Sequence, residues 1–302
     1  MSYAGPEFGS PQPRRPRRRP LAVALAVLVP GALLGWLVYA GVSGAADNNG
    51  TAAAASPRAS APPTVSSTTA EDKKPLGSLR GKVVVIDPGH NLTNFRHTAE
   101  INRKVDIGTN RKECDTTGTS TNSGYAEAKF TLDVAHRLRT LLERQGATVT
   151  LTQDGDRPYG PCVDERARIG NRAKADAVVS IHADGAGAGQ RGYHVILPGR
   201  VHHGIADTRR IVAPSAELGK RIAHDFGRAT RTAPSNYVGH GTGLDTRTDL
   251  GGLNLSKVPK VFIECANMRD SKDAALLTSA AWRQKAAQGI AAGIGSYLSN
   301  TL

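Results

Sequence analysis

The sequence predicts an α/β fold, with a single domain whose twisted, mostly parallel sheet carries helices on both faces. Two observations lead to this prediction. About 220 residues with ordinary globular patterning follow Leu79, which is enough for one buried core and too few to require two. Within them, short β-branched segments alternate with longer segments of helical period, as in proteins with helices packed against a parallel sheet.

The first 78 residues differ in composition from the rest. Residues 1–20 are polar, Pro-rich and basic, and we interpret them as a cytoplasmic tail. Residues 21–46 carry no charge, so we expect a transmembrane anchor with the N-terminus inside, or a signal segment that is cleaved. Residues 47–78 lack the large apolar side chains that offset chain entropy, which predicts a disordered linker. Residues 79–302 then form the catalytic domain, outside the cytoplasm in either case.

The expected strands and helices follow in order from Lys82. Apolar segments predict strands at 82–86, 147–152, 176–182, 192–197 and 260–264. A helix is expected to begin near Gly124, capped by Asn122 or Ser123, because apolar residues then recur at helical spacing up to Gly146. Further helices are predicted at 163–175, 215–230 and 274–298, and long loops at 91–124 and 239–257.

Charge narrows the range of partners. Residues 71–302 hold 33 Lys and Arg against 24 Asp and Glu, a net charge of +9. Export and low aromatic content make nucleic acid an unsuitable partner, whereas an anionic wall polymer would suit the basic excess. A basic surface that serves only solubility is the alternative.

Three predicted strands end in residues suited to metal chemistry: His90 after the first, His182 and Glu264. Glu127 lies on the inward stripe of the first long helix, where a buried carboxylate needs a partner. Because sites of open α/β sheets form beyond the carboxyl ends of strands, these residues are expected to converge there. Two imidazoles and a carboxylate are a common zinc set, with Glu264 as general base.

Each of these residues also has an ordinary structural explanation. A histidine at a strand end is often a hydrogen-bonded structural residue, Glu127 would pair equally well with a buried arginine, and Glu264 would serve as a cap for the next segment. The spacing forms no compact metal motif. The pattern alone therefore leaves zinc and the structural alternatives both open.

Four segments in order resemble one known family. They are KVVVIDPGH (82–90), GYAEAKFTLDVAHRLRTLLERQGATVTLT (124–152), DERARIGNRAKADAVVSIHAD (164–184) and KVFIECANMRD (260–270). They look like the zinc-dependent N-acetylmuramoyl-L-alanine amidases of bacterial walls (the amidase_3 family), in particular those of actinobacteria. The likeness extends from about residue 81 to residue 298, nearly the whole catalytic domain.

The resemblance implies a phosphorylase/hydrolase-like fold and zinc bound by His90, Glu127 and His182, with Glu264 as the catalytic base. The implied reaction cleaves the amide between N-acetylmuramic acid and L-alanine, in peptidoglycan or its muropeptide fragments. Two rivals remain: a zinc peptidase or deacetylase on the same polymer, and a catalytically silent homologue that binds wall or regulates a partner.

The three cysteines include no CxxC pair, which excludes a cysteine zinc site. Cys265 ends an apolar strand and is expected to be a buried hydrophobic residue. Cys114 and Cys162 both lie in predicted loops, and in an oxidising compartment we expect them to pair.

Overall fold

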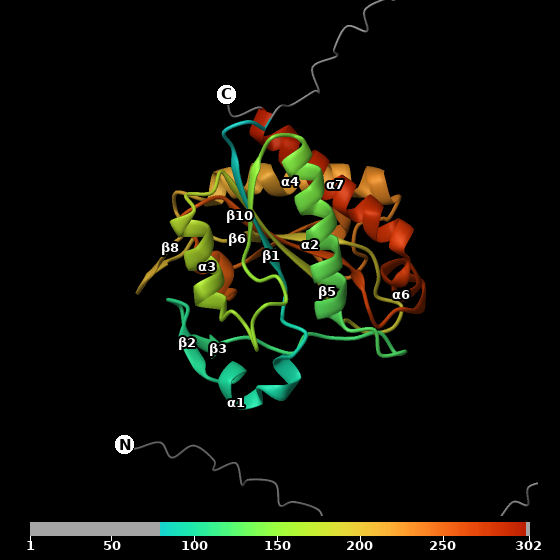
Figure 1. The fold of residues 1–302 in the computed structure, drawn as a ribbon, viewed down its shortest axis with the longest axis horizontal. Coiled ribbons are helices and arrows are strands. Elements are labelled where there is room, and N and C mark those ends of the chain that lie inside the picture. Colours follow the sequence, from blue (N-terminus) through green and yellow to red (C-terminus); the bar gives the residue numbers. More distant parts are fainter. Residues whose placement is uncertain (1–78, 300–302) are drawn as a thin grey trace, which may run out of the picture. The chain divides into compact units, whose positions relative to one another are not determined.

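The computed structural model describes residues 79–299, so the segments predicted at 1–20, 21–46 and 47–78 lie outside the described residues. The described chain forms a central six-stranded sheet with helices on both faces, as expected (Figure 1). The order across the sheet is β4 (Thr148–Leu151), β1 (Val83–Pro88), β5 (Ala177–Asp184), β10 (Lys260–Asn267), β6 (His194–Pro198) and β9 (Leu244–Arg247). The first four strands are parallel, and β6 and β9 run antiparallel to them.

Three long helices cover one face of the sheet: α2 (Glu127–Arg144), α4 (Val212–Thr230) and α7 (Ala280–Ser299). Their apolar residues pack on alternate strand residues such as Ile86 and Ile181 in the main core. The other face is covered by α3 (Val163–Arg172) over Val85 and Val178. A Cβ at Gly293 would lie 2.5 Å from the Cα of Ile222, so α7 requires glycine there to approach α4 closely.

Strand register arranges polar residues in rows near the carboxyl ends of the parallel strands. Asp87 of β1 pairs with Ser180 of β5, which pairs with Phe262 of β10. The next row, two residues further along, pairs His182 of β5 with Glu264 of β10 and Glu264 with His194 of β6. Because side chains alternate between faces with a period of two, both rows point to the α3 side of the sheet.

The two predicted loops hold more structure than expected. The first contains a 3₁₀ turn (Asn94–Arg96), α1 (Thr98–Ile101) and a small hairpin of β2 (Lys104–Asp106) and β3 (Arg111–Glu113). The second contains a 3₁₀ turn (Gly239–Gly241), β9 and α5 (Gly251–Asn254). A further hairpin, which we had not predicted, joins β7 (His202–His203) to β8 (Ala206–Asp207). These elements are too short for a hydrophobic period to reveal them.

Several helix boundaries also differ from the prediction. The first long helix begins at Glu127 rather than near Gly124, and its cap is Ala126, without the side-chain hydrogen bond expected of Asn122 or Ser123. The residues before it form a turn in which the amide of Glu127 donates to the carbonyl of Thr119. The C-terminal helix predicted as 274–298 is two helices, α6 (Ser271–Thr278) and α7, because Ser279 between them is extended.

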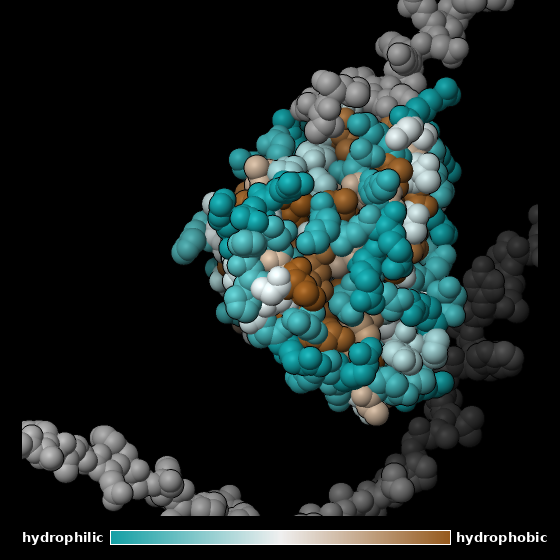
Figure 2. Space-filling view, turned by 90° about the vertical axis from the view of Figure 1, so that its left-hand side faces the viewer, coloured by the Kyte–Doolittle hydropathy of each residue, from teal (hydrophilic) through white to brown (hydrophobic). Residues whose placement is uncertain are grey.

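One side of the described chain, which carries β2, α3 and β8, is mainly hydrophilic with a small exposed hydrophobic area near its middle (Figure 2). A groove of about 460 Å³ is lined by residues of β2, β3 and α3, with five basic and two acidic side chains: Arg103, Lys104, Arg111, Arg168, Lys257, Asp106 and Asp164.

Within residues 79–299, no helix is both long enough and apolar enough to cross a membrane.

Candidate metal centre

The structure brings His90, Glu127 and His182 together, although they come from three separate segments. Their potential ligand atoms all lie within 4.8 Å of one another. The Oε1 atom of Glu127 lies 3.1 Å from Nε2 of His90 and 3.0 Å from Nδ1 of His182. One nitrogen of each imidazole therefore faces the same carboxylate oxygen.

Each of the three residues reaches this point from the carboxyl edge of the sheet. His90 lies two residues beyond β1, in the left-handed region with φ of 63°. His182 is part of β5, and Glu127 is the first residue of α2, where its side chain is 5% exposed. The amide of Ala183 donates to Glu127 Oε1, which ties the start of the helix to the strand.

Two glycines leave the space that the cluster needs. A Cβ at Gly89 would lie 2.3 Å from Cε1 of His182, and one at Gly118 would lie 2.7 Å from Cδ2 of His90 and 2.8 Å from Oε2 of Glu127. Gly118 also has a φ of 73°, which favours glycine. The backbone is thus shaped around the two rings and the carboxylate.

The electrostatics of the cluster favour a cation. Burial alone would raise the pKa of Glu127, but the adjacent imidazoles of His90 and His182 outweigh it and hold that pKa well below its usual range. Burial would lower the pKa of His90, whereas the carboxylates of Glu127 and Asp115 raise it to about 10. The buried carboxylates therefore favour positive charge between the rings.

The donor set matches that of a catalytic zinc site, in which three protein ligands leave one position open. Glu264 borders the same cavity, of about 330 Å³, together with Arg247 and Asp184. Its Oε2 atom is buried and has no hydrogen-bond partner among the described residues. Burial, reinforced by the carboxylates of Glu127 and Asp184, raises the pKa of Glu264 well above its usual range. A raised pKa makes the carboxylate a stronger base, which suits a group that accepts a proton and then returns it.

Sequence reasoning missed the buried network beneath the site. Asp87, which directly follows the first predicted strand, is fully buried between Arg166 and Lys260, at 2.8 and 2.9 Å. Arg166 also donates to Asp115 and to the carbonyl of His90. The sequence did indicate buried charges, since Lys260 opens an apolar strand and Arg166 lies on the buried stripe of its helix. It did not show which residue pairs with each charge.

His194 was also missed. It is the register partner of Glu264 and is 3% exposed, with its ring 5.9 Å from that of Tyr237. The hydroxyl of Tyr237 donates to Asp184, which borders the cavity. His194 therefore lies beside the candidate base, although it is not one of the clustered ligands.

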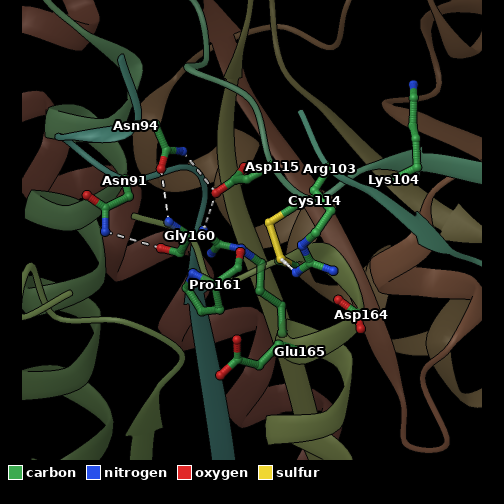
Figure 3. The surroundings of a disulfide bond; sticks show 12 residues. Asn91, Asn94, Arg103, Lys104, Cys114, Asp115, Gly160, Pro161, Asp164 and Glu165 are labelled. Carbon is green, nitrogen blue, oxygen red and sulfur yellow. Dashed lines mark hydrogen bonds and ion pairs between the residues drawn. A yellow bond between two sulfur atoms is a disulfide. The ribbon is translucent and has the colours of Figure 1, made fainter. Parts of the chain in front are cut away.

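The predicted disulfide between Cys114 and Cys162 is present, and Cys265 is a buried free cysteine, as expected. Figure 3 shows the bridge beside a set of hydrogen bonds in which Asn94 donates to Asp115 and accepts from the amide of Gly160. The bridge fastens the long segment after His90 to the start of α3. Asp115, next to the bridge, in turn lies 3.5 Å from Nδ1 of His90.

Comparison with known proteins gives a consistent result. The Amidase_3 family, described as N-acetylmuramoyl-L-alanine amidase, matches residues 84–296. The chain is 40% identical over 222 residues to the N-acetylmuramoyl-L-alanine amidase Rv3717 of Mycobacterium tuberculosis, covering 73% of this chain and 88% of that protein. The crystal structure of the amidase Ami1 from Mycobacterium smegmatis superposes with a TM-score of 0.67 at 37% identity, covering 74% of this chain and 99% of that one.

Proposed function

Because this chain belongs to the N-acetylmuramoyl-L-alanine amidase family, Amidase_3, we propose that it hydrolyses the amide joining N-acetylmuramic acid to L-alanine. The substrate is peptidoglycan or its muropeptide fragments, and the reaction depends on zinc. The observation that carries the proposal is the convergence of His90, Glu127 and His182 around a space bordered by Glu264.

In this proposal, His90, Glu127 and His182 hold the zinc ion. When bound, zinc supplies Lewis acidity, which lowers the pKa of water and polarises a carbonyl. Two neutral imidazoles and one carboxylate leave a single positive charge on the occupied site. The buried carboxylate of Asp115, 3.5 Å from Nδ1 of His90, stabilises that charge.

Glu264 is the proposed general base and then general acid. It takes a proton from the attacking water and returns it to the nitrogen of the departing L-alanine. The raised pKa of Glu264 supports the first step, because a carboxylate with a higher pKa is a stronger base toward the proton of water. Glu264 is partly buried, and its Oε2 atom lies out of contact with solvent, which shields this exchange from bulk water.

The proposal is tested by making the same substitution at the two glutamates. Glu264→Gln should keep zinc near one ion per chain while activity on purified wall falls, because loss of a general base typically costs about 10²–10⁴-fold. Glu127→Gln should lower zinc affinity and activity together. Zinc is measured by elemental analysis after dialysis, and activity by release of reactive amines. If Glu264→Gln lost its zinc and Glu127→Gln kept it, the roles of ligand and general base would have to be exchanged between the two glutamates.

Product analysis separates the proposed activity from its rivals. An amidase exposes the amine of L-alanine and leaves the sugar strands intact. A peptidase would expose other residues of the stem peptide, and a deacetylase would produce free amino sugars. A catalytically silent homologue would bind zinc and wall without releasing any product.

We also propose that the chain acts outside the cytoplasm, on the cell wall. Residues 1–20 would form a cytoplasmic tail, 21–46 a membrane anchor or cleaved signal, and 47–78 a linker to the catalytic domain. Recovery of the full chain in the membrane fraction would support the anchor. A mature protein in the medium that begins just after the small residues at 43–45 would support cleavage, and a cytoplasmic full-length chain would contradict both.

A further inference from the structure

The two clustered imidazoles each have a second nitrogen, which points away from Glu127 and contacts another residue behind the ring. Nδ1 of His90 lies 3.1 Å from the carbonyl oxygen of Thr116 and 3.2 Å from its hydroxyl. Nε2 of His182 lies 3.3 Å from Oγ of Ser180. A neutral imidazole carries its proton on one nitrogen only, so these rear contacts determine which nitrogen is free to bind a metal.

The direction of each rear hydrogen bond follows from its partner. The carbonyl of Thr116 can only accept, so His90 donates from Nδ1 and keeps the lone pair on Nε2. The hydroxyl of Ser180 has a single proton, which it donates to Oδ2 of Asp87 at 2.9 Å. Ser180 can then only accept from His182, which must carry its proton on Nε2 and keep the lone pair on Nδ1.

Asp87 is placed to hold the Ser180 proton in that direction. It is fully buried, and each of its oxygens accepts two hydrogen bonds. Oδ1 accepts from Thr152 at 2.6 Å and Arg166 at 2.8 Å, and Oδ2 accepts from Ser180 and from Lys260, both at 2.9 Å. The two cations keep Asp87 ionised, and a buried carboxylate is a stronger acceptor for the hydroxyl than an imidazole nitrogen.

The hydrogen bonds that run from His182 through Ser180 to Asp87 form a relay. The ring of His182 is also held in place by contacts outside this relay. It stacks on Phe262, with centroids 5.2 Å apart and an interplanar angle of 15°, and Gly89 lies against its edge. The register that pairs Asp87 with Ser180 and Ser180 with Phe262 therefore sets both the orientation of the ring and the position of its proton.

We propose that Asp87, acting through Ser180, is a positioning group that keeps the proton of His182 on Nε2. His182 then binds the metal through Nδ1, whereas His90, which donates to Thr116, binds through Nε2. This inference rests on the metal centre of the proposed function and extends it to residues outside the three clustered ligands.

The sheet provides a matched pair of variants for the test. Ser180→Ala and Thr152→Val each remove one hydroxyl that donates to Asp87, and both positions are buried. Only Ser180 also contacts an imidazole. A loss that reflects general weakening around Asp87 should appear in both variants, whereas a loss through the relay should appear in Ser180→Ala alone.

Zinc affinity, measured by chelator competition, is the first readout. Loss of a partner behind a metal-binding histidine typically weakens metal binding by about 10–100-fold, so Ser180→Ala should show a loss in that range and Thr152→Val should match the unmodified protein. The second readout is the ¹⁵N spectrum of the zinc-loaded protein. It should show zinc on Nδ1 of His182 and a protected proton on Nε2, with that proton exposed to exchange in Ser180→Ala only.

Two results would overturn the inference: equal zinc affinity in the two variants, or zinc bound to Nε2 of His182. The proposed function fails separately, if the zinc-loaded chain releases no L-alanine amine from wall while Ser180→Ala still shows its selective loss of affinity. Conversely, normal wall hydrolysis with unaltered zinc affinity in Ser180→Ala would remove the relay and leave the function standing.

Discussion

Removing the bridge between Cys114 and Cys162 should destabilise the fold without weakening the metal centre. The cysteines are 48 residues apart in the sequence. Closing a loop of that length lowers the conformational entropy of the unfolded chain by a constant of about 2.1 cal/mol/K and by about 12 cal/mol/K that depends on the logarithm of the loop length. At 25 °C this entropy corresponds to a free energy of about 4 kcal/mol. This contribution acts on the unfolded chain, so we expect Cys114→Ala with Cys162→Ala to lower the free energy of unfolding by about that amount.

Urea unfolding at a fixed zinc concentration measures the effect. With a slope of about 2 kcal/mol/M, the midpoint of the double variant should fall by about 2 M. Cys265→Ala is the control, because it removes a buried sulfur and keeps the bridge. Zinc affinity of the double variant should be unchanged, since Asn94 and Arg166 still hold Asp115. A large loss of zinc affinity with little change in the midpoint would refute the reasoning and show that the bridge acts on the native state.

The remaining predictions concern the backbone around the site and the buried charges beneath it. Gly118→Ala should lower zinc affinity, because its Cβ would displace His90 and Glu127. Gly124→Ala is the control and should leave zinc affinity unchanged, because Gly124 has the same left-handed backbone but open space around it. Equal affinities of the two variants in chelator competition would contradict this prediction. Burial would raise the pKa of Asp87, but Lys260 and Arg166 outweigh it and hold that pKa well below its usual range. The unfolded chain therefore binds the extra proton, and stability from Asp87 is present above about pH 4 and lost as the pH falls below it. Asp87→Asn should cost about 3–5 kcal/mol at pH 7, because it leaves two buried cations without their carboxylate. Urea midpoints of the two proteins should converge toward pH 2, and a constant difference between them would count against Asp87 as the acid-sensitive group.

Local sequence pattern was sufficient for the elements that are long or strongly periodic. The strand before His90, the helix that carries Phe130 and Val134 on its buried stripe, and the strand that contains His182 are all present, with ends that differ from the predicted ones by a few residues. These signals are local, because hydrophobic period depends only on residues a few positions apart. The order of His90, Glu127, His182 and Glu264 along those elements was also sufficient to predict that they share one edge of the sheet.

The tertiary structure alone decided which atoms meet. Nothing near Asp87 in the sequence shows that it contacts Ser180, Arg166 and Lys260, which lie 79–173 positions away. Strand order and register create those contacts, and both depend on the packing of the whole core rather than on any short segment. The sequence by itself therefore identified the side chains of the proposed metal centre, whereas the nitrogen that each histidine would present to a metal depends on long-range pairing, because a hydrogen-bond direction depends on the partner that folding supplies.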